Sequence, residues 1–252
     1  MQYVLSSRNR QVLKKFALSN TLVAFDFDGT LAPIVRNRHR AAIRNTTRSL
    51  LAKLTALYPC VVISGRARKD VRCRLRGIGI KEIVGNHGIE PWSTNPAMEK
   101  AVRRWLPLLK DKLREFPGVE IENKRFSVAV HYRHELRKQE ARVAIAAAAR
   151  GLGAVRLVGG KQVVNILPGG APHKGLALQR ELVRMRCSEA IYIGDDVTDE
   201  DVFTLPDHGR LLTIRVELNR NSLAKYYIRD QNEIDVVIER LVELRSSAAP
   251  RQ

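Results

Sequence analysis

A chain of 252 residues, of which 44% are hydrophobic and 28% charged, has the composition of a folded globular protein and excludes a largely disordered or collagenous one. No apolar run approaches the roughly 20 residues that cross a bilayer. Basic side chains interrupt the amino-terminal segment where a signal peptide needs an apolar stretch. We therefore expect a cytoplasmic protein without a membrane span. Three cysteines at unrelated spacings indicate free thiols: Cys60, Cys73 and Cys187.

The 44 Lys and Arg residues outnumber the 26 Asp and Glu residues, which gives a formal net charge of +18. The first interpretation is a solvated basic surface, and the second is a field that steers an anionic substrate towards its site. Only 6% of the residues are aromatic, and the arginines occur along the whole chain. Nucleic-acid binding is not expected, because it favours clustered basic residues with aromatic side chains on which bases stack.

Four short apolar runs each end in a polar turn that contains glycine, at residues 22–27, 60–63, 83–84 and 190–193. Such runs suit strands buried on both faces of a parallel sheet, and segments with helical periodicity lie between them, such as residues 46–58 and 174–186. The pattern predicts an α/β fold with a doubly wound, Rossmann-like parallel sheet. Ligands bind beyond the carboxyl ends of the strands in such sheets, where all four polar turns would lie.

The middle of the chain has a different pattern, with an expected order of helix, hairpin, helix, hairpin over residues 97–116, 119–132, 136–150 and 155–167. Gly159 and Gly160 are expected to form the two-residue turn of the second hairpin. Alternating apolar residues at 125–132 indicate an antiparallel sheet with one covered face. We therefore predict a small α+β cap at residues 95–170, inserted between two core segments, 1–94 and 171–252.

Asp26 and Asp28 follow the first apolar run, and Gly29 lets the chain turn sharply there. Two carboxylates two residues apart at a strand end lie on the same side. One of them can attack phosphorus to give an aspartyl-phosphate, and the other can transfer protons. A simple turn or a fragment of a calcium loop is the alternative interpretation of this short motif.

Five acids lie within seven residues, from Asp195 to Asp201. Carboxylates this close repel one another unless a cation or a helix amino terminus compensates them. One interpretation is a helix start, where acids favour the helix dipole. In the other, Asp195 lies beside Asp26 and completes an oxygen-rich site that suits Mg2+.

Ser64 follows the second apolar run, and Lys174 starts a helix. A hydroxyl and an ammonium group are simple phosphate ligands, and the ammonium offsets negative charge on a phosphoryl group in transfer. A serine at a strand end is by itself more often a helix cap. A nucleophile, a hydroxyl, a lysine and a metal-binding acid in this order together indicate a phosphoryl-transfer site.

The order of the segments DFDGTL, SGR, HKG and GDDVTDEDVF resembles the haloacid dehalogenase superfamily of Mg2+-dependent phosphohydrolases with an inserted cap. More narrowly, GNHGIE, ENK, SVAVHYR and GDDVTDEDVF are similar to trehalose-6-phosphate phosphatases, and the resemblance runs from about Leu22 to Leu244. It implies cleavage of trehalose 6-phosphate to trehalose and phosphate through an aspartyl-phosphate.

The resemblance also implies a role for each residue that matches a motif. Asp26 would be the nucleophile and Asp28 the general acid and then base, with Ser64 and Lys174 as the other catalytic groups. The Mg2+ ligands would be Asp26, the Asp28 carbonyl and Asp195, with support from Asp196 and Asp199. Substrate-binding residues are expected at the strand ends and on the open face of the cap: Thr30, Gly65, Arg66, Asn86, His87, Lys124, His131, Arg133 and Asn165.

The cap departs from the family in one strand, where VVNILP stands in place of a V-V-E-I-R-P-like pattern. Asn165 can still form hydrogen bonds with sugar hydroxyls but carries no charge, and Leu167 also differs. Sucrose 6-phosphate and a glucosyl-glycerate phosphate are therefore alternative substrates. A catalytically silent sugar-phosphate or nucleic-acid binder is the alternative from another class. A sugar-phosphate synthase of the same pathway is a candidate partner.

Overall fold

The computed structural model describes residues 1–35 and 37–248, so residues 249–252 of the expected second core segment lie outside the described residues. Its core is a parallel sheet with the strand order β1-β11-β10-β9-β2-β3-β4. In chain order the strands are β1 (Gln2–Tyr3), β2 (Thr21–Phe25), β3 (Cys60–Ile63), β4 (Glu82–Val84), β9 (Glu189–Gly194), β10 (Leu211–Val216) and β11 (Tyr226–Ile228). The expected doubly wound α/β core is confirmed.

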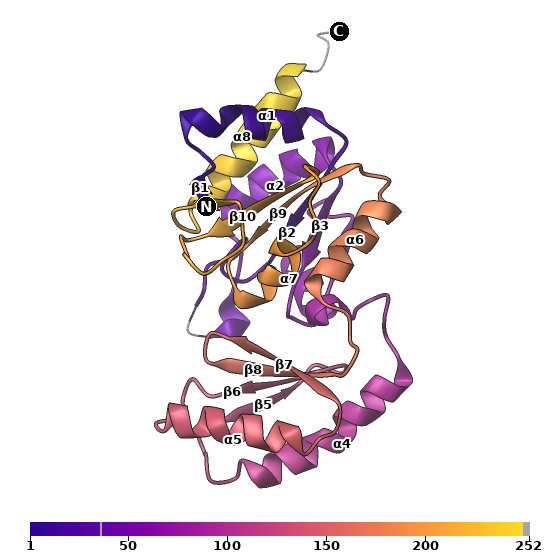
Figure 1. Ribbon diagram of the computed structural model, residues 1–252, viewed down its shortest axis with the longest axis vertical. Coiled ribbons are helices and arrows are strands. Elements are labelled where there is room, and N and C mark those ends of the chain that lie inside the picture. Colours follow the sequence, from indigo (N-terminus) through magenta and orange to yellow (C-terminus); the bar gives the residue numbers. More distant parts are fainter. Residues whose placement is uncertain (36, 249–252) are drawn as a thin grey trace.

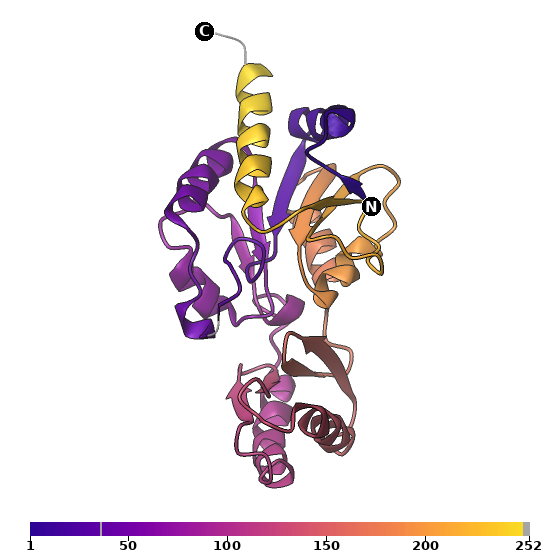
Figure 2. The same cartoon turned by 90° about the vertical axis from the view of Figure 1, so that its left-hand side faces the viewer.

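Helices cover both faces of this sheet (Figures 1 and 2). One face packs against α1 (Arg10–Leu18), α2 (Asn45–Leu57), α3 (Arg68–Arg74) and α8 (Glu233–Ala248), and the other against α6 (Lys174–Arg184) and α7 (Glu200–Phe203). Val23 and Phe25 of β2 face the first layer, whereas Leu22 and Ala24 face the second. Apolar side chains are therefore needed at every position of the strand, which explains the uninterrupted apolar runs.

The cap forms a separate antiparallel sheet in the order β5-β6-β8-β7. Its strands are β5 (Glu120–Asn123), β6 (Val128–His131), β7 (Val155–Gly160) and β8 (Val163–Pro168). The helices α4 (Pro96–Lys112) and α5 (Lys138–Arg150) cover the face away from the core, and the other face is turned towards the core (Figure 1). Val128 and Val130 pack under these helices, as the alternation in β6 predicts. The expected order of helix, hairpin, helix, hairpin is confirmed.

The turn of the second cap hairpin differs from the prediction. Gly159 and Gly160 belong to β7, and Gly160 pairs with Val163, so the turn consists of Lys161 and Gln162. A Cβ on Gly160 would lie 2.8 Å from Val163 Cγ1 and 3.4 Å from the Asp196 carboxylate. Glycine is thus needed here for a close approach within a strand, not for a turn.

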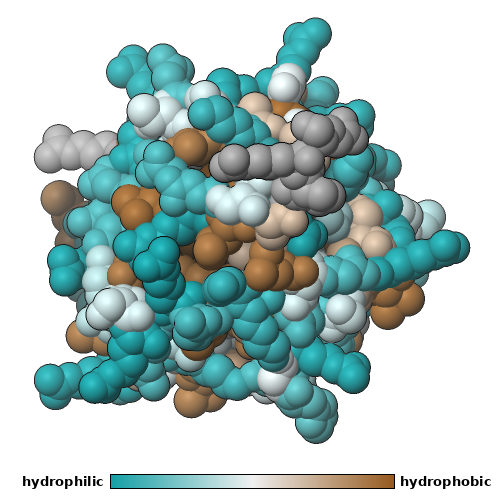
Figure 3. Space-filling model, turned by 90° about the horizontal axis from the view of Figure 1, so that it is seen from above, coloured by the Kyte–Doolittle hydropathy of each residue, from teal (hydrophilic) through white to brown (hydrophobic). Residues whose placement is uncertain are grey.

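Other differences concern the ends of elements and of the chain. The first cap helix ends at Lys112, before the predicted residue 116, and β6 is shorter than predicted. β1, β10 and β11 were not predicted as strands. No helix in the described part of the chain is long and apolar enough to cross a membrane, and the three cysteines are free. The end of the core farthest from the cap presents mostly hydrophilic side chains (Figure 3).

Candidate active site

Four polar turns meet at the carboxyl edge of the core sheet, on the side that faces the cap. Asp26 follows β2, Ser64 follows β3, Asn86 follows β4, and Asp195 follows β9. Because the strands are parallel, their carboxyl ends share one edge, so the order of the turns along the chain becomes an arrangement in space. Lys174, the first residue of α6, reaches the same place.

Lys174 is the centre of a buried ion network, with only 1% of its surface exposed. Its Nζ lies 2.7 Å from Asp26 Oδ1 and 2.8 Å from Asp199 Oδ1. Burial alone would lower the pKa of Lys174, but the two carboxylates outweigh it and raise this pKa. The lysine is therefore a fixed positive charge beside the predicted nucleophile.

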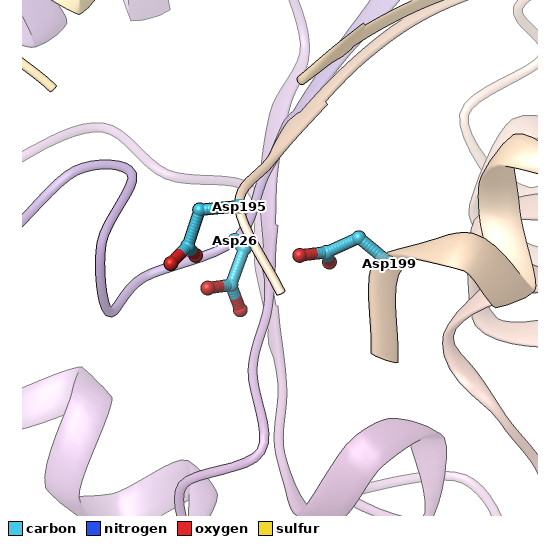
Figure 4. A group of neighbouring side chains, drawn as sticks. All are labelled: Asp26, Asp195 and Asp199. Atoms are coloured by element: carbon cyan, nitrogen blue, oxygen red, sulfur yellow. The ribbon is translucent and has the colours of Figure 1, made fainter. Parts of the chain in front are cut away.

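Asp26, Asp195 and Asp199 form an acid cluster, in which one oxygen from each side chain lies within 4.8 Å of the others (Figure 4). Burial raises the pKa of Asp26 to about 7, against the effect of Lys174. Burial and the neighbouring carboxylates also raise the pKa of Asp195 well above its ordinary value. One lysine cannot neutralise three buried carboxylates, and this excess of negative charge favours a bound cation.

Two further observations fit a divalent cation at the acid cluster. Asp195 Oδ1 is buried and has no hydrogen-bond partner among the residues that the structure describes. Gly29, at φ +81°, lies so close to Asp195 that a Cβ would come within 2.0 Å of its Oδ2. Both oxygens of Asp199 are already used, by Lys174, the Tyr192 hydroxyl and the Asp196 backbone N–H. Asp26 and Asp195 are therefore the better placed ligands.

The carboxylate of Asp28 lies outside the acid cluster and is held by Arg66. The guanidinium donates from Nε to Asp28 Oδ2 at 2.6 Å and from Nη2 to Asp28 Oδ1 at 2.7 Å. Its Nη1 donates to Asp70 at 2.7 Å. Arg66, predicted to bind substrate, thus orients the predicted proton donor in this structure, and its contact with substrate stays a prediction.

Three residues with predicted phosphate or sugar contacts are buried beside the strand ends. Ser64 Oγ accepts from the Arg66 backbone N–H at 3.2 Å. His87 packs on Gly65, where a Cβ would lie 2.4 Å from its ring, and neither ring nitrogen has a partner in the described part of the chain. Burial, followed by Lys124 and Lys174, lowers the pKa of His87 well below its ordinary value, so the ring is neutral. The Thr30 hydroxyl is likewise buried without a partner among the described residues.

Lys124, which directly follows β5, and Asn165 of β8 project from the cap towards the core. Lys124 Nζ donates to Asn165 Oδ1 at 3.1 Å and to the Gly65 carbonyl at 2.9 Å. Asn86 Nδ2 donates to the Lys124 carbonyl at 3.0 Å, and Ser127 Oγ donates to Asn86 Oδ1 at 2.7 Å. The predicted sugar-binding pair therefore lies against the turn that follows β3, which is predicted to bind phosphate.

A second contact joins the cap to the core through Arg38, which sequence analysis did not single out. Arg38 pairs with Glu122 at 2.5 Å and with Glu120 at 2.9 Å, and it also contacts His131. His131 Nε2 lies 3.0 Å from Glu122 Oε2. Arg133 donates to the Val35 carbonyl at 3.0 Å. The predicted substrate residues His131 and Arg133 thus take part in cap-to-core contacts.

Asp196 and Asp199 form a reciprocal cap at the start of a 3-10 helix (Val197–Asp199). Asp196 Oδ1 accepts from the Val197 N–H at 2.7 Å, and Asp199 Oδ2 accepts from the Asp196 N–H at 2.9 Å. Both interpretations of the acidic run therefore apply: Asp196 caps a helix, Asp195 lies in the acid cluster, and Asp199 takes part in both. Sequence analysis did not single out Tyr192, which donates to Asp199, or Arg215, which donates to the Asp195 carbonyl. The repulsion among five neighbouring acids was the signal that such partners are needed.

Comparison with known proteins gives a consistent result. The sequence profile of the trehalose-phosphatase family matches residues 24–227. The trehalose-phosphate phosphatase of Mycobacterium tuberculosis is 36% identical over 226 residues, covering 81% of this chain and 57% of that protein. That of Mycolicibacterium paratuberculosis is 34% identical over 218 residues, covering 79% and 54%. The chain thus spans about half the length of these curated relatives. The C-terminal domain of C. albicans trehalose-6-phosphate phosphatase has the same fold, with a TM-score of 0.75, 19% identity and coverage of 93% and 97%.

Proposed function

Because this chain belongs to the trehalose-phosphatase family, we propose that it is a Mg2+-dependent phosphohydrolase that cleaves trehalose 6-phosphate to trehalose and phosphate. The observation that carries the proposal is the buried pair of Asp26 and Lys174 next to Asp195, at the strand ends that face the cap. A carboxylate, a fixed ammonium group and a place for a divalent cation are the groups that phosphoryl transfer requires.

In the first step, Asp26 attacks phosphorus, so that a carboxylate oxygen–phosphorus bond forms and the bond to the sugar oxygen breaks. Asp28 gives its proton to the departing sugar oxygen. In the second step, Asp28 takes a proton from water as that water attacks phosphorus, which releases phosphate and restores Asp26. Both oxygens of Asp28 accept from Arg66, so Asp28 must leave Arg66 and take up a proton from solvent before the first step. The substrate phosphate is a suitable replacement partner for the guanidinium.

Lys174 holds the phosphoryl oxygens and offsets their charge, with Asp199 keeping its ammonium in place. Asp26 and Asp195 would bind the Mg2+ ion, which neutralises negative charge on the phosphoryl group when it is present. Ser64 and Thr30 offer hydroxyls to the phosphate. Both residues are buried at the strand ends.

The cap is proposed to select the sugar. Lys124 and Asn165 lie above the phosphate-binding turns and present an ammonium and an amide, both suited to sugar hydroxyls. His87 adds a neutral ring beside Gly65. The missing carboxylate at position 165 is the reason to test other glycosyl phosphates.

The test is phosphate release from a panel of trehalose 6-phosphate, sucrose 6-phosphate, a glucosyl-glycerate phosphate and an aryl phosphate. It is run with Mg2+, after EDTA, and after Mg2+ is added back. We expect the highest kcat/KM for trehalose 6-phosphate and no turnover in EDTA. A preference for another glycosyl phosphate would change the substrate but keep the mechanism, and full activity without metal would contradict the mechanism. A cytoplasmic location and a sugar-phosphate synthase as partner also stay predictions.

A further inference from the structure

Arg215 is a charged residue buried in the core sheet next to the acid cluster, and the mechanism above does not use it. It is the fifth residue of β10 and pairs with Gly194 of β9, so it lies beside the point where the Asp195 turn begins. Only 8% of its surface is exposed. A buried guanidinium is costly unless it forms hydrogen bonds or ion pairs, so the groups that it contacts indicate its role.

The guanidinium group binds the backbone of the acidic turn. It donates to the carbonyl of Asp195 from Nη2 and to the carbonyl of Asp196 from Nη1 at 3.3 Å. Nη1 also lies 3.2 Å from Glu200 Oε1, at the first residue of α7. Two consecutive carbonyls and one carboxylate are thus held by a single planar fork, a geometry that a lysine cannot reproduce.

This arrangement determines the direction of the Asp195 side chain. With the carbonyls of Asp195 and Asp196 held on the Arg215 side, the carboxylate of Asp195 points to Gly29 and the acid cluster. The positive charge of Arg215 also lowers the repulsion within the run of five acids, to which Lys174 adds a second positive charge at Asp199. Without this arginine, Asp195 would lose both its anchor and part of its charge compensation.

We propose that Arg215 is a positioning residue that holds Asp195 ready for the divalent cation. The inference rests on the proposed function in one respect only, the presence of a cation at the acid cluster. Groups that orient metal ligands typically change metal affinity by about 10- to 100-fold when they are removed. We therefore expect Arg215→Met to bind the cation about tenfold more weakly, while kcat at saturating Mg2+ stays close to that of the wild type.

The experiment measures Mn2+ binding directly, by the loss of the free-ion EPR signal, on the full chain without substrate. The Mg2+ concentration for half-maximal phosphate release is measured in parallel. Arg215→Lys keeps the charge and should fall between the wild type and Arg215→Met. Arg240→Met is the matched control, because Arg240 also donates to a backbone carbonyl, that of Leu5, but from α8 on the opposite face of the sheet. It should leave Mn2+ affinity unchanged.

A wild-type Mn2+ affinity in folded Arg215→Met would overturn the inference. If that variant does not fold, Arg215→Gln, which keeps one donor, is judged by the same criterion. A fall in kcat at saturating Mg2+ with unchanged Mn2+ affinity would also overturn it. If the wild type hydrolyses none of the sugar phosphates but Arg215→Met still binds Mn2+ more weakly, the proposed function fails and the inference stands.

Discussion

The Nζ of Lys174 lies 2.7 Å from Oδ1 of Asp26, although 148 positions separate the two residues in the chain. The whole cap is inserted between them, so neither residue can reach the other until both core segments join one sheet. Both side chains are almost completely buried, with 2% and 6% exposed. The pair therefore links the stability of the core directly to the proposed chemistry.

Replacement of Lys174 by methionine should destabilise the protein as well as inactivate it. Asp26 and Asp199 would remain buried without their common partner, and breaking a buried pair in this way costs about 3–5 kcal/mol. Urea unfolding measures the loss in the free energy of unfolding. Lys53→Met, an exposed position on α2, is the control and should change it by less than about 0.5 kcal/mol. Equal losses in both variants would show that the buried network carries no special stability.

Asp26→Asn should abolish phosphate release, because an amide cannot form the acyl phosphate. Asp28→Asn should lose roughly a factor of 100 to 10000, the usual contribution of general acid-base catalysis. Asp70→Asn is the matched control, since Asp70 shares Arg66 with Asp28 but has no proposed step. Steady-state kinetics on trehalose 6-phosphate measure all three variants. Near-normal turnover by Asp26→Asn would rule out the covalent mechanism.

Asn165→Glu should raise kcat/KM for trehalose 6-phosphate and leave that for an aryl phosphate unchanged. Hydrogen bonds to charged groups contribute about 1.5–3 kcal/mol, against about 0.5–1.5 for neutral ones. Lys124→Met should lower kcat/KM for trehalose 6-phosphate but not for the aryl phosphate, because the Lys124 ammonium lies in the cap above the turn at Gly65. Lys161→Met, in the turn of the β7–β8 hairpin, serves as the control. Equal effects on both substrates would mean that these residues act on folding or cap closure.

The Glu122 contact should make stability depend on pH under acidic conditions. Burial alone would raise the pKa of Glu122, but the hydrogen bond with His131 and the charges of Lys124 and Arg38 lower it from 4.5 to about 2. A lowered carboxyl pKa stabilises the folded state above pH 4.5, and this stability is lost as the pH falls towards about 2. We expect the Tm of the wild type to fall more steeply over this range than that of Glu122→Gln. Parallel Tm curves for the two proteins would contradict this.

Salt should lower kcat/KM moderately if the basic surface steers the substrate. Residues 36–81 hold 13 of the 44 Lys and Arg residues but only one acid, Asp70, so the charge is more concentrated than its spread along the chain indicates. Charges are screened beyond about 8 Å at 0.15 M salt. The double variant Arg72→Glu/Arg76→Glu should lose rate at low salt, whereas Arg104→Glu/Lys110→Glu on α4 should lose less. Sub-micromolar nucleic-acid binding at 0.15 M salt would refute the steering interpretation.

Sequence patterns alone were sufficient for the layers of the core and for the strand ends that carry the site. Leu22 to Phe25 are all apolar because both faces of β2 are covered, and a polar turn must follow where the strand reaches the edge of the sheet. The alternation in β6 and β8 was sufficient to place Asn165 on the face opposite Val164 and Ile166. These features depend on local periodicity, which a sequence displays directly.

Pairings between distant side chains were decided only by the tertiary structure. Arg66 binds Asp28, Arg38 reaches Glu122 in the cap, and Arg215 anchors the Asp195 turn. Each contact depends on how two elements pack, and an arginine at an exposed position looks the same in a sequence as one at a buried position. The Gly159–Gly160 error has the same origin: glycine is compatible with a tight turn and with a close approach, and only the neighbouring Asp196 and Val163 decide between them. Sequence thus determined which groups reach the edge of the sheet, and packing determined which of them neutralise one another there.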